Sequence, residues 1–373
     1  MARVLVLTAS MGSGHDGVAR ELGRRLRQRG CDVMIVDLLG QYPFGLGRLL
    51  RGGYAAMLHG APWLYELIFR IFFVVRRHRG AEVSPVVSLV APSLRRLVDA
   101  TSPDAVVSTF HLAGLVAGRL RRQGRLSAPS MVLVTDPAAH HLWRDRSTDL
   151  YLCAYPGQAG ELSHDLGVPS MSIRPVVRPQ FRSPSVGLGF TDWLPDGEDR
   201  KVVMVSTGSW GIGRPARVAA ALYSTGRYLP VVLCGHNRDL ETRLRARQDC
   251  IALGWVESPE HIMATASALV ENSGGGLTCW EAFAAGLPVV TFKPIPGHGR
   301  AGARCLARAG LTLLATDDEE LVAALDDVTA GSSSTRERLR SAEGALFGAG
   351  RVEADAAISA RLLARPGTHG VAS

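Results

Sequence analysis

The sequence predicts an α/β protein made of two doubly wound, Rossmann-like domains. Its 373 residues and 39.9 kDa exceed what one typical hydrophobic core accommodates, which favours two domains. An apolar run over residues 4–7 leads into a cluster of glycine and serine, then a helical pattern, and then a second apolar run at 32–38. This order of strand, glycine loop, helix and strand opens a doubly wound sheet, and it begins again at residue 201.

The first copy of the pattern defines a domain over residues 1–180. Val18, Leu22 and Leu26 recur at helical spacing over 16–29, and Gly30 is placed to end that helix. Further strands are expected at 105–109, 131–135 and 150–154, and further helices at 89–100 and 113–123.

A linker, a second domain and a returning helix are expected after residue 180. Residues 181–200 are rich in proline, glycine and aspartate and lack periodicity, which is typical of an interdomain linker. The second domain spans 201–347, with strands at 201–206, 229–234, 251–253, 268–271 and 288–292 and helices at 215–226 and 277–285. A last helix within 348–365 is expected to return to the first domain, and the tail 366–373 is expected to be disordered.

Composition places the chain among ordinary globular proteins of the cytoplasm. Hydrophobic residues make up 46% and charged residues 20%, which excludes a disordered or fibrous chain. No export signal is recognised, and the most apolar stretch, 61–75, is interrupted by Glu66 and Arg70 and is too short to span a bilayer. Six cysteines without paired short spacings fit reduced thiols, so we expect no metal held by cysteine.

Basic residues are concentrated in the first half of the chain. Residues 1–180 hold 22 arginines and no lysine against 13 acidic residues, whereas the remainder holds 20 basic and 21 acidic residues. Such asymmetry is typical of proteins that meet nucleic acid, an anionic membrane or an anionic substrate. Since no nucleic-acid-binding motif accompanies it, we expect no nucleic-acid partner and favour an anionic membrane surface.

The first glycine loop offers a binding motif and a candidate base. Residues 12–17 match G-x-G-x-x-G after a strand, and Asp37 stands where a dinucleotide domain binds ribose, so an NAD-dependent enzyme is one alternative. A glycine turn at a helix start binds anions in general, however, so the motif indicates geometry more than ligand. His15 can take a proton from an alcohol, because imidazole titrates near neutrality, or it caps the helix start.

Polar residues after the strand at 131–135 are candidates for an acceptor pocket. Asp136, His140 and Trp143 follow the carboxyl end of that strand, where open α/β sheets place ligand-binding residues. Asp136, His140 and His141 come from one short loop, with no second cluster to complete a metal site, so no metal is expected. We expect Trp143 to form a flat apolar wall of the pocket; the alternative is a helix cap with a core tryptophan.

The strongest constellation is a glycine run that opens a helix. It comprises Ser273, Gly274, Gly275 and Gly276. Bare backbone N–H groups and the positive end of the helix dipole predict a diphosphate site there. Glu281 lies about one turn further along the helix, where a carboxylate can accept both hydroxyls of a ribose. The alternative is a purely structural helix start with a surface glutamate.

Together these segments resemble the monogalactosyldiacylglycerol synthase and processive diacylglycerol glucosyltransferase family. The resemblance rests on S-M-G-S-G-H at 10–15, T-D-x-x-x-H-x-x-W at 135–143, V-V-R-P-Q-F at 176–181 and the run 273–288, in the family's order. That family is related to the peptidoglycan lipid N-acetylglucosaminyltransferase and has the GT-B fold, in which two Rossmann-like domains face each other across a cleft. The resemblance implies an inverting, metal-independent transfer from a UDP-sugar to an acceptor hydroxyl, without a cofactor.

The resemblance also implies roles for individual residues. His15 is expected to be the catalytic base, with Gly14, Asp136, His140 and Trp143 on the acceptor side. The expected donor-binding residues are Gly208, Ser209, Gly235, Val256, Ser273, Gly274, Gly275, Gly276, Thr278, Glu281, His298 and Gly299. The family's Gln-Glu pair, which is expected to contact the donor sugar, is replaced by His298 and Gly299. The donor sugar is therefore open, and Arg300 with His298 favours an acidic sugar such as a uronic acid.

The segment 42–79 bears on the acceptor. Its aromatic and aliphatic residues are interleaved with Arg48, Arg51, Arg70, Arg76, Arg77 and Arg79. Such a pattern is typical of a surface that enters the interfacial zone and meets anionic headgroups. We therefore expect a lipid or lipid-like acceptor and a protein that is peripheral on the inner face of the cell membrane. The alternatives are a buried helical pair, a hydrophobic pocket for a soluble natural product, a nucleotide-sugar 2-epimerase, or a membrane-binding protein without activity.

Overall fold

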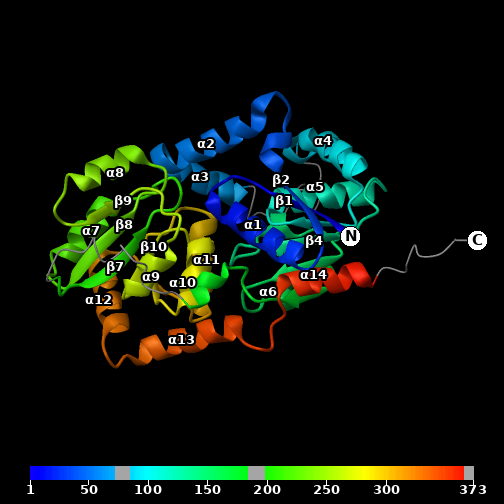
Figure 1. Ribbon diagram of the computed structural model, residues 1–373. Helices are drawn as coiled ribbons and strands as arrows, with labels where there is room; N and C mark the ends of the chain where they lie inside the picture. The colour runs from blue at the N-terminus through cyan, green and yellow to red at the C-terminus, as the bar shows by residue number, and fades with distance from the viewer. Residues whose placement is uncertain (72–84, 184–197, 365–373) are drawn as a thin grey trace, which may run out of the picture.

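Two parallel six-stranded sheets covered by helices make up the protein (Figure 1). The computed structural model describes residues 1–71, 85–183 and 198–364. The first sheet has the order β2-β1-β3-β4-β5-β6, with β1 (Arg3–Thr8), β2 (Asp32–Asp37), β3 (Ala105–Ser108), β4 (Ser130–Val134), β5 (Leu150–Cys153) and β6 (Ser170–Ser172). The second has the order β12-β11-β10-β7-β8-β9, with β7 (Lys201–Ser206), β8 (Tyr228–Leu233), β9 (Ile251–Leu253), β10 (Ala268–Glu271), β11 (Val289–Phe292) and β12 (Leu313–Ala315). The predicted pair of doubly wound sheets is confirmed.

Helices connect successive strands in both halves. The first half contains α1 (Ser13–Gln28), α2 (Leu46–Gly60), α3 (Pro62–Phe69), α4 (Pro85–Thr101), α5 (His111–Arg122) and α6 (Gln158–Leu166), with short 3-10 helices η1 (Leu38–Gln41), η2 (Pro43–Gly45), η5 (His141–Trp143) and η6 (Pro179–Arg182). The second half contains α7 (Pro215–Tyr223), α8 (Arg238–Arg245), α9 (Glu260–Thr265), α10 (Leu277–Ala285), α11 (His298–Arg308), α12 (Asp318–Thr329) and α13 (Ser334–Phe347), and α14 (Ala354–Leu363) follows.

The central strands are buried on both faces. Every residue of β3, β4, β10 and β11 is buried, and most of these residues are apolar. Continuous apolar runs are typical of parallel strands that have helices on both sides. The strand order reverses between β1 and β3 and again between β7 and β10, and such switch points open a crevice at the carboxyl ends of the strands. The loop before His15 follows β1 and the glycine run follows β10, so both loops start at a switch point.

The last helix packs against the first half of the molecule. Arg25 of α1 forms an ion pair with Glu353 at 2.7 Å, and Arg29 pairs with Asp355 of α14. A parallel bridge joins Ile173 to Val352. The segment for which a returning helix is expected therefore lies on α1, on the side of the first sheet (Figure 1).

Helices α2 and α3 reach from the first domain to the second. Tyr65 and Phe69 on the inner side of this hairpin pack in one cluster with Ile212 and Ile295. The outer side, with the preceding η2, exposes large apolar side chains: Phe44 in η2, Leu49 in α2, and Trp63 and Leu67 in α3. The hairpin is thus neither wholly buried nor wholly a surface element, which combines two of the alternatives for segment 42–79.

Parts of three sequence expectations lie outside the described residues. They are the arginines Arg76, Arg77 and Arg79, the linker residues 184–197, and the tail from residue 365. Within the described ranges, no helix combines the length and apolar character that crossing a bilayer requires. The structure also adds edge strands β6 and β12, whose three residues are too few to show a clear apolar alternation.

Candidate active site between the two sheets

The N-termini of two helices, one from each domain, face each other. The N-cap residues are Gly12 for α1 and Gly276 for α10, and neither helix has a side-chain cap. A Cβ atom built on Gly14 would lie 3.7 Å from the amide nitrogen of Leu277, and one on Gly17 would lie 2.3 Å from the Leu277 side chain. Because a helix start carries unpaired N–H groups and a partial positive charge, this junction favours an anion between the two helix ends.

His15 stands in the first turn of α1 with one ring nitrogen engaged. Its Nδ1 lies 3.0 Å from the carbonyl oxygen of Thr109 and 3.0 Å from Oγ1 of Thr135. A carbonyl oxygen can only accept, so this contact favours the tautomer that carries its proton on Nδ1. Phe110 packs edge-on against the ring at a centroid distance of 5.1 Å. The neutral side chain then has its lone pair on Nε2, as a general base requires.

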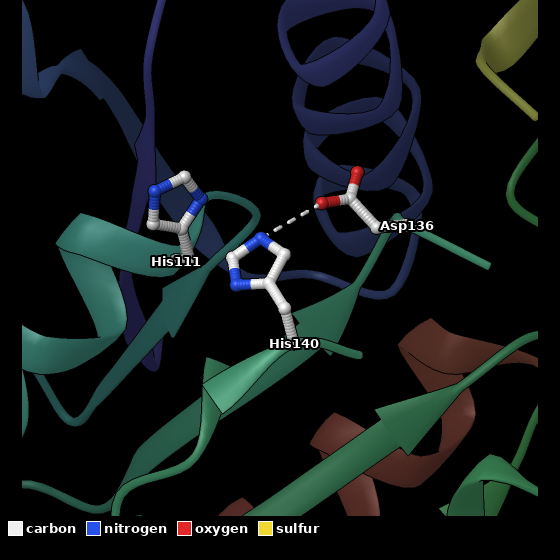
Figure 2. A group of neighbouring side chains, drawn as sticks. All are labelled: His111, Asp136 and His140. Atoms are coloured by element: carbon white, nitrogen blue, oxygen red, sulfur yellow. Dashed lines mark ion pairs between the residues drawn. The ribbon is translucent and has the colours of Figure 1, made fainter. Parts of the chain in front are cut away.

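A group of two histidines and one aspartate lies beside this loop (Figure 2). His111 comes from the start of α5, and Asp136 and His140 come from the loop after β4. Nε2 of His140 lies 3.5 Å from Oδ2 of Asp136, and one ligand atom from each of the three residues lies within 4.8 Å of the others. The three side chains can therefore hold a metal ion. His111 was not among the candidates from the sequence. It joins two residues of the loop after β4, Asp136 and His140, to complete the group of three.

Burial and neighbouring charge set the protonation of this group. Burial alone would raise the pKa of Asp136, but the hydrogen bond from His140 and the charges of His15, His140 and His298 lower it below its usual value. Burial lowers the pKa of His111, and it lowers the pKa of His298 to about 4. Near neutral pH the site therefore contains an ionised Asp136 and neutral His111 and His298.

Trp143 does not form the expected wall of an acceptor pocket. Its side chain is 2% exposed and packs in a core cluster with Val132, Val134 and Tyr151. Its Nε1 donates a hydrogen bond to Oδ2 of Asp136 at 2.9 Å. An indole in the core has no face to offer a ligand, so Trp143 acts by orienting Asp136. The alternative of a core tryptophan describes this residue better.

The glycine run is organised by a buried carboxylate that sequence reasoning did not assign. Glu271, at the end of β10, accepts hydrogen bonds from the amides of Ser273 and Gly274 at 2.6 and 2.9 Å. It also accepts from the hydroxyls of Ser273 and Thr291. These two amides are therefore not open to a diphosphate, contrary to expectation.

The donors that remain at this helix end are further along the chain. The Gly276 amide donates to Oγ of Ser273 at 3.2 Å, and the Cys279 amide donates to the Gly276 carbonyl. Leu277 and Thr278 occupy the first turn of α10, where N–H groups have no acceptor within the helix. Of the expected donor-binding residues, Thr278 is thus better placed to meet a diphosphate than the predicted run of Ser273 to Gly276.

Glycines are required where the two domains and the two loops meet. Gly275 has φ +113°, and a Cβ atom on it would lie 2.2 Å from Cγ of Pro137 in the first domain. A Cβ atom on Gly274 would lie 2.0 Å from the carbonyl oxygen of Gly299. The run is therefore wedged between the loop of Asp136 and the start of α11, which brings His298 and Gly299 to the same junction.

Glu281 is buried next to Arg178, which precedes η6 at the end of the first domain. It is 5% exposed, and Nη2 of Arg178 lies 3.6 Å from Glu281 and 3.8 Å from Glu260. Burial raises the pKa of Glu281 to about 8; Arg178 opposes the rise and Glu260 adds to it. The expected surface alternative for Glu281 is wrong. Arg178 lies in one of the motifs that carry the family resemblance. Nothing in the neighbouring sequence indicates that it pairs with Glu281.

An open cavity of about 820 Å³ lies at the carboxyl end of β8 and β9. Gly235 and Val256 both line it, as does Trp255, whose ring stacks on His236 at 4.3 Å. Gly235 has φ +61°, and a Cβ atom there would lie 2.5 Å from the carbonyl oxygen of Gly208 and 2.6 Å from that of Ser209. The structure therefore brings together four of the expected donor-binding residues, Gly208, Ser209, Gly235 and Val256.

Asp37, on which the alternative of an NAD-dependent enzyme rests, forms hydrogen bonds within the protein. Oδ1 of Asp37 accepts hydrogen bonds from the amides of Leu39 and Ser10, at 2.9 and 3.3 Å. Asp37 thereby caps η1 and fixes the first glycine loop. A carboxylate used in this way fits a structural role better than a ribose site.

Comparisons with known proteins agree with the predicted fold. The family model described as monogalactosyldiacylglycerol (MGDG) synthase matches residues 15–176, which is less than half of the chain. A processive diacylglycerol beta-glucosyltransferase of Bacillus cereus is 28% identical over 333 residues, which cover 86% of this chain and 84% of the relative.

Solved structures extend the likeness over the whole fold. The glycosyltransferase SsfS6 of Streptomyces sp. SF2575, complexed with thymidine diphosphate, matches with a TM-score of 0.60 at 15% identity, over 97% of this chain and 99% of that chain. Medicago truncatula UGT71G1, complexed with UDP-glucose, matches with a TM-score of 0.61 at 13% identity, over 97% of each chain.

Proposed function

For this chain, a glycosyltransferase of the GT-B fold that resembles the monogalactosyldiacylglycerol synthases, we propose a UDP-sugar donor and a lipid hydroxyl as acceptor. We further propose that transfer inverts the anomeric carbon and needs no metal. The observation that carries this proposal is the pair of facing helix starts. The amides of Leu277 and Thr278 attract a diphosphate, and His15 stands opposite them on the acceptor domain.

The proposed reaction follows from the tautomer of His15. The acceptor hydroxyl donates its proton to Nε2 while Nδ1–H stays on the Thr109 carbonyl. The acceptor oxygen attacks the anomeric carbon from the face opposite the diphosphate, and the bond from that carbon to the phosphate oxygen breaks. Backbone amides and the dipole of α10 stabilise the charge on the departing UDP.

Glu281 favours a ribonucleotide over a deoxyribonucleotide donor. A carboxylate that accepts from both ribose hydroxyls loses one hydrogen bond when the 2′-hydroxyl is absent, as in thymidine diphosphate. Such a loss costs about 0.5–1.5 kcal/mol, or roughly three- to tenfold in affinity. The uracil ring would bind beyond the ribose, in the cavity lined by Gly235 and Val256.

The lipid acceptor is supported by the outer face of α2 and α3. Phe44, Leu49 and Trp63 are exposed there, together with Arg48 and Arg51. Exposed aromatic and aliphatic groups beside guanidinium groups suit the interfacial zone of an anionic bilayer. The Bacillus cereus relative is a processive diacylglycerol beta-glucosyltransferase, which supports the same class of acceptor. We place the enzyme at the inner face of the cell membrane, as a peripheral protein.

Transfer assays with two kinds of acceptor test this proposal. Each UDP-sugar of a panel is supplied with diacylglycerol in anionic vesicles or with a soluble aromatic alcohol, and UDP release and the product mass are measured. We expect UDP release and a glycosylated lipid with the vesicles, with the anomeric configuration inverted by NMR. Turnover with the soluble alcohol alone would contradict the lipid acceptor. Turnover with dTDP-sugars alone would contradict the UDP donor.

A further inference from the structure

Side chains of α3 in the acceptor domain form hydrogen bonds with the start of α11 in the donor domain. Oη of Tyr65 lies 2.8 Å from Nδ1 of His298. Oε2 of Glu66 accepts a hydrogen bond from the Gly297 amide at 2.8 Å and lies 3.3 Å from Nη1 of Arg300. Neighbouring residues of α3 therefore hold the start of α11, where His298 and Gly299 replace the family's Gln-Glu pair.

The contact is close-packed as well as hydrogen-bonded. Gly297 has φ +70°, and a Cβ atom on it would lie 2.8 Å from Cγ of Phe69 and 2.9 Å from Cε1 of Tyr65. Tyr54 adds ring contacts to Tyr65 at 5.0 Å and to His298 at 6.5 Å. The start of α11 is therefore fixed by side chains of the other domain, which limits the positions that the His298 ring can adopt.

The ring of His298 is near the reacting groups. The carbonyl oxygen of the next residue, Gly299, lies 2.0 Å from a Cβ atom built on Gly274, so the ring lies at the same junction as the candidate base. Burial keeps the side chain neutral near pH 7, and a neutral imidazole has one donor nitrogen and one acceptor nitrogen. The partner at Nδ1 therefore decides whether the other nitrogen, Nε2, donates or accepts.

We propose that Tyr65 positions His298 for the donor sugar, so that a residue of the acceptor domain helps to set donor specificity. The Tyr65 hydroxyl donates to Nδ1, which places the imidazole proton on Nε2, and Nε2–H donates to an oxygen of the sugar. This inference rests on the proposed UDP-sugar function. It assigns Tyr65 a positioning role, because Tyr65 acts through His298.

The same contacts point to a neutral hexose rather than an acidic sugar. Arg300 has an acidic partner in Glu66, so its charge is already compensated. Burial alone would raise the pKa of Glu66, but the Gly297 amide, Arg70 and Arg300 lower it, so Glu66 is ionised near neutral pH. A sugar carboxylate would meet the negative charges of Glu66 and Asp136 close to His298. The expectation of a uronic acid from Arg300 is therefore replaced by that of a neutral sugar.

A double-mutant cycle measured by calorimetry tests this inference. UDP, UDP-glucose, UDP-galactose, UDP-N-acetylglucosamine and UDP-glucuronate are titrated into the wild type, Tyr65→Phe, His298→Ala and the double variant. Tyr223→Phe, which removes a hydroxyl from α7, is the matched control. We expect a neutral UDP-sugar to bind more tightly than UDP, and Tyr65→Phe to weaken it about three- to tenfold. The Kd of UDP itself should change less than about twofold.

The cycle separates a positioning role from a structural one. We expect Tyr65→Phe to have no further effect in the His298→Ala background, because its influence passes through the imidazole. An effect that persists in that background, or one that weakens UDP and UDP-sugar equally, would overturn the role of Tyr65. Tightest binding of UDP-glucuronate would overturn the neutral sugar. A wild type that binds neither UDP nor any UDP-sugar would instead refute the proposed function on which this inference rests.

Discussion

The two glycine-rich loops at the junction occupy equivalent positions in their sheets but present different chemical groups. Each follows a strand at a switch point and opens a helix that lacks a side-chain cap. The first loop leads into a helical turn that presents a side chain, His15, whose ring is oriented by Thr109 and Phe110. The loop before α10 presents backbone, because Glu271 folds the glycine run and leaves the amides of the first helical turn.

The two loops therefore differ in the substitutions that they tolerate. In the first loop, one side chain carries the proposed proton transfer, so its removal affects the rate more than binding. In the second loop, the glycines themselves are required, since Gly274 and Gly275 have positive φ and touch neighbouring atoms. Substitutions in the two loops should therefore separate catalysis from donor binding.

The largest effect is expected for His15→Ala. Loss of a general base lowers kcat by about 10²–10⁴-fold. His164→Ala, which removes an exposed histidine from α6, is the matched control and should leave kcat unchanged. Steady-state UDP release from pH 6 to 9 measures both variants. A His15→Ala enzyme within a few-fold of wild type would transfer the base role to Asp136 or His140.

A smaller effect, on binding, is expected for Gly275→Ala. The added Cβ would clash with Pro137 and strain a backbone with φ +113°, at a cost of about 1–3 kcal/mol. UDP affinity should fall roughly 5- to 150-fold if this strain acts on the bound state. Gly286→Ala is the control, because Gly286 ends the same helix with φ +66° and has open space around it. Equal UDP affinities of the two variants by calorimetry would show that close packing at Gly275 is unimportant.

The pH dependence of UDP binding tests the role of Glu281. Its pKa is raised to about 8, so the fraction of ionised carboxylate rises as pH increases from 6.5 to 8.5. Ribose hydroxyls donate to the ionised form better, so UDP affinity should increase by roughly three- to tenfold over that range. Glu281→Gln should bind UDP more weakly and with little dependence on pH. A wild-type affinity that falls with rising pH would contradict this sign.

The smallest effect on rate is expected from chelation. If the amides and dipole of α10 stabilise the departing diphosphate, EDTA should change kcat by less than about twofold. His111, Asp136 and His140 can hold a metal, however, so the experiment is a real test of the proposal. EDTA could instead abolish activity, with Mg²⁺, Mn²⁺ or Zn²⁺ restoring it and His111→Ala reproducing the loss. That result would show that His111, Asp136 and His140 form a metal site.

Much of the fold could be predicted because its signals are local. Helix α10 was expected at the residues where it occurs, since three glycines precede it and Gly286, in a left-handed conformation, ends it. Some available signals were overlooked. Asp317 caps α12 by accepting from the Glu320 amide, and Glu320 accepts from the Thr316 amide, which is a recognisable start signal in the sequence.

The site residues that were missed depend on contacts between distant segments. His111 joins Asp136 because β3 and β4 are neighbours in the sheet, and no pattern within either loop reveals that pairing. Arg178 meets Glu281, and Tyr65 meets His298, only after the two domains have come together. Trp143 was assigned to a pocket because an aromatic residue in a loop has no periodicity that would indicate burial.

Donor binding by the His15→Ala variant tests most directly whether the first loop serves catalysis and the second serves donor binding. UDP is titrated calorimetrically into wild type and variant at pH 8, where kcat of both is also measured. We expect the Kd of UDP to be unchanged within about twofold and kcat to be at least about 100-fold lower in the variant. A Kd that weakens by about tenfold or more would contradict this expectation, because His15 would then belong to the donor site.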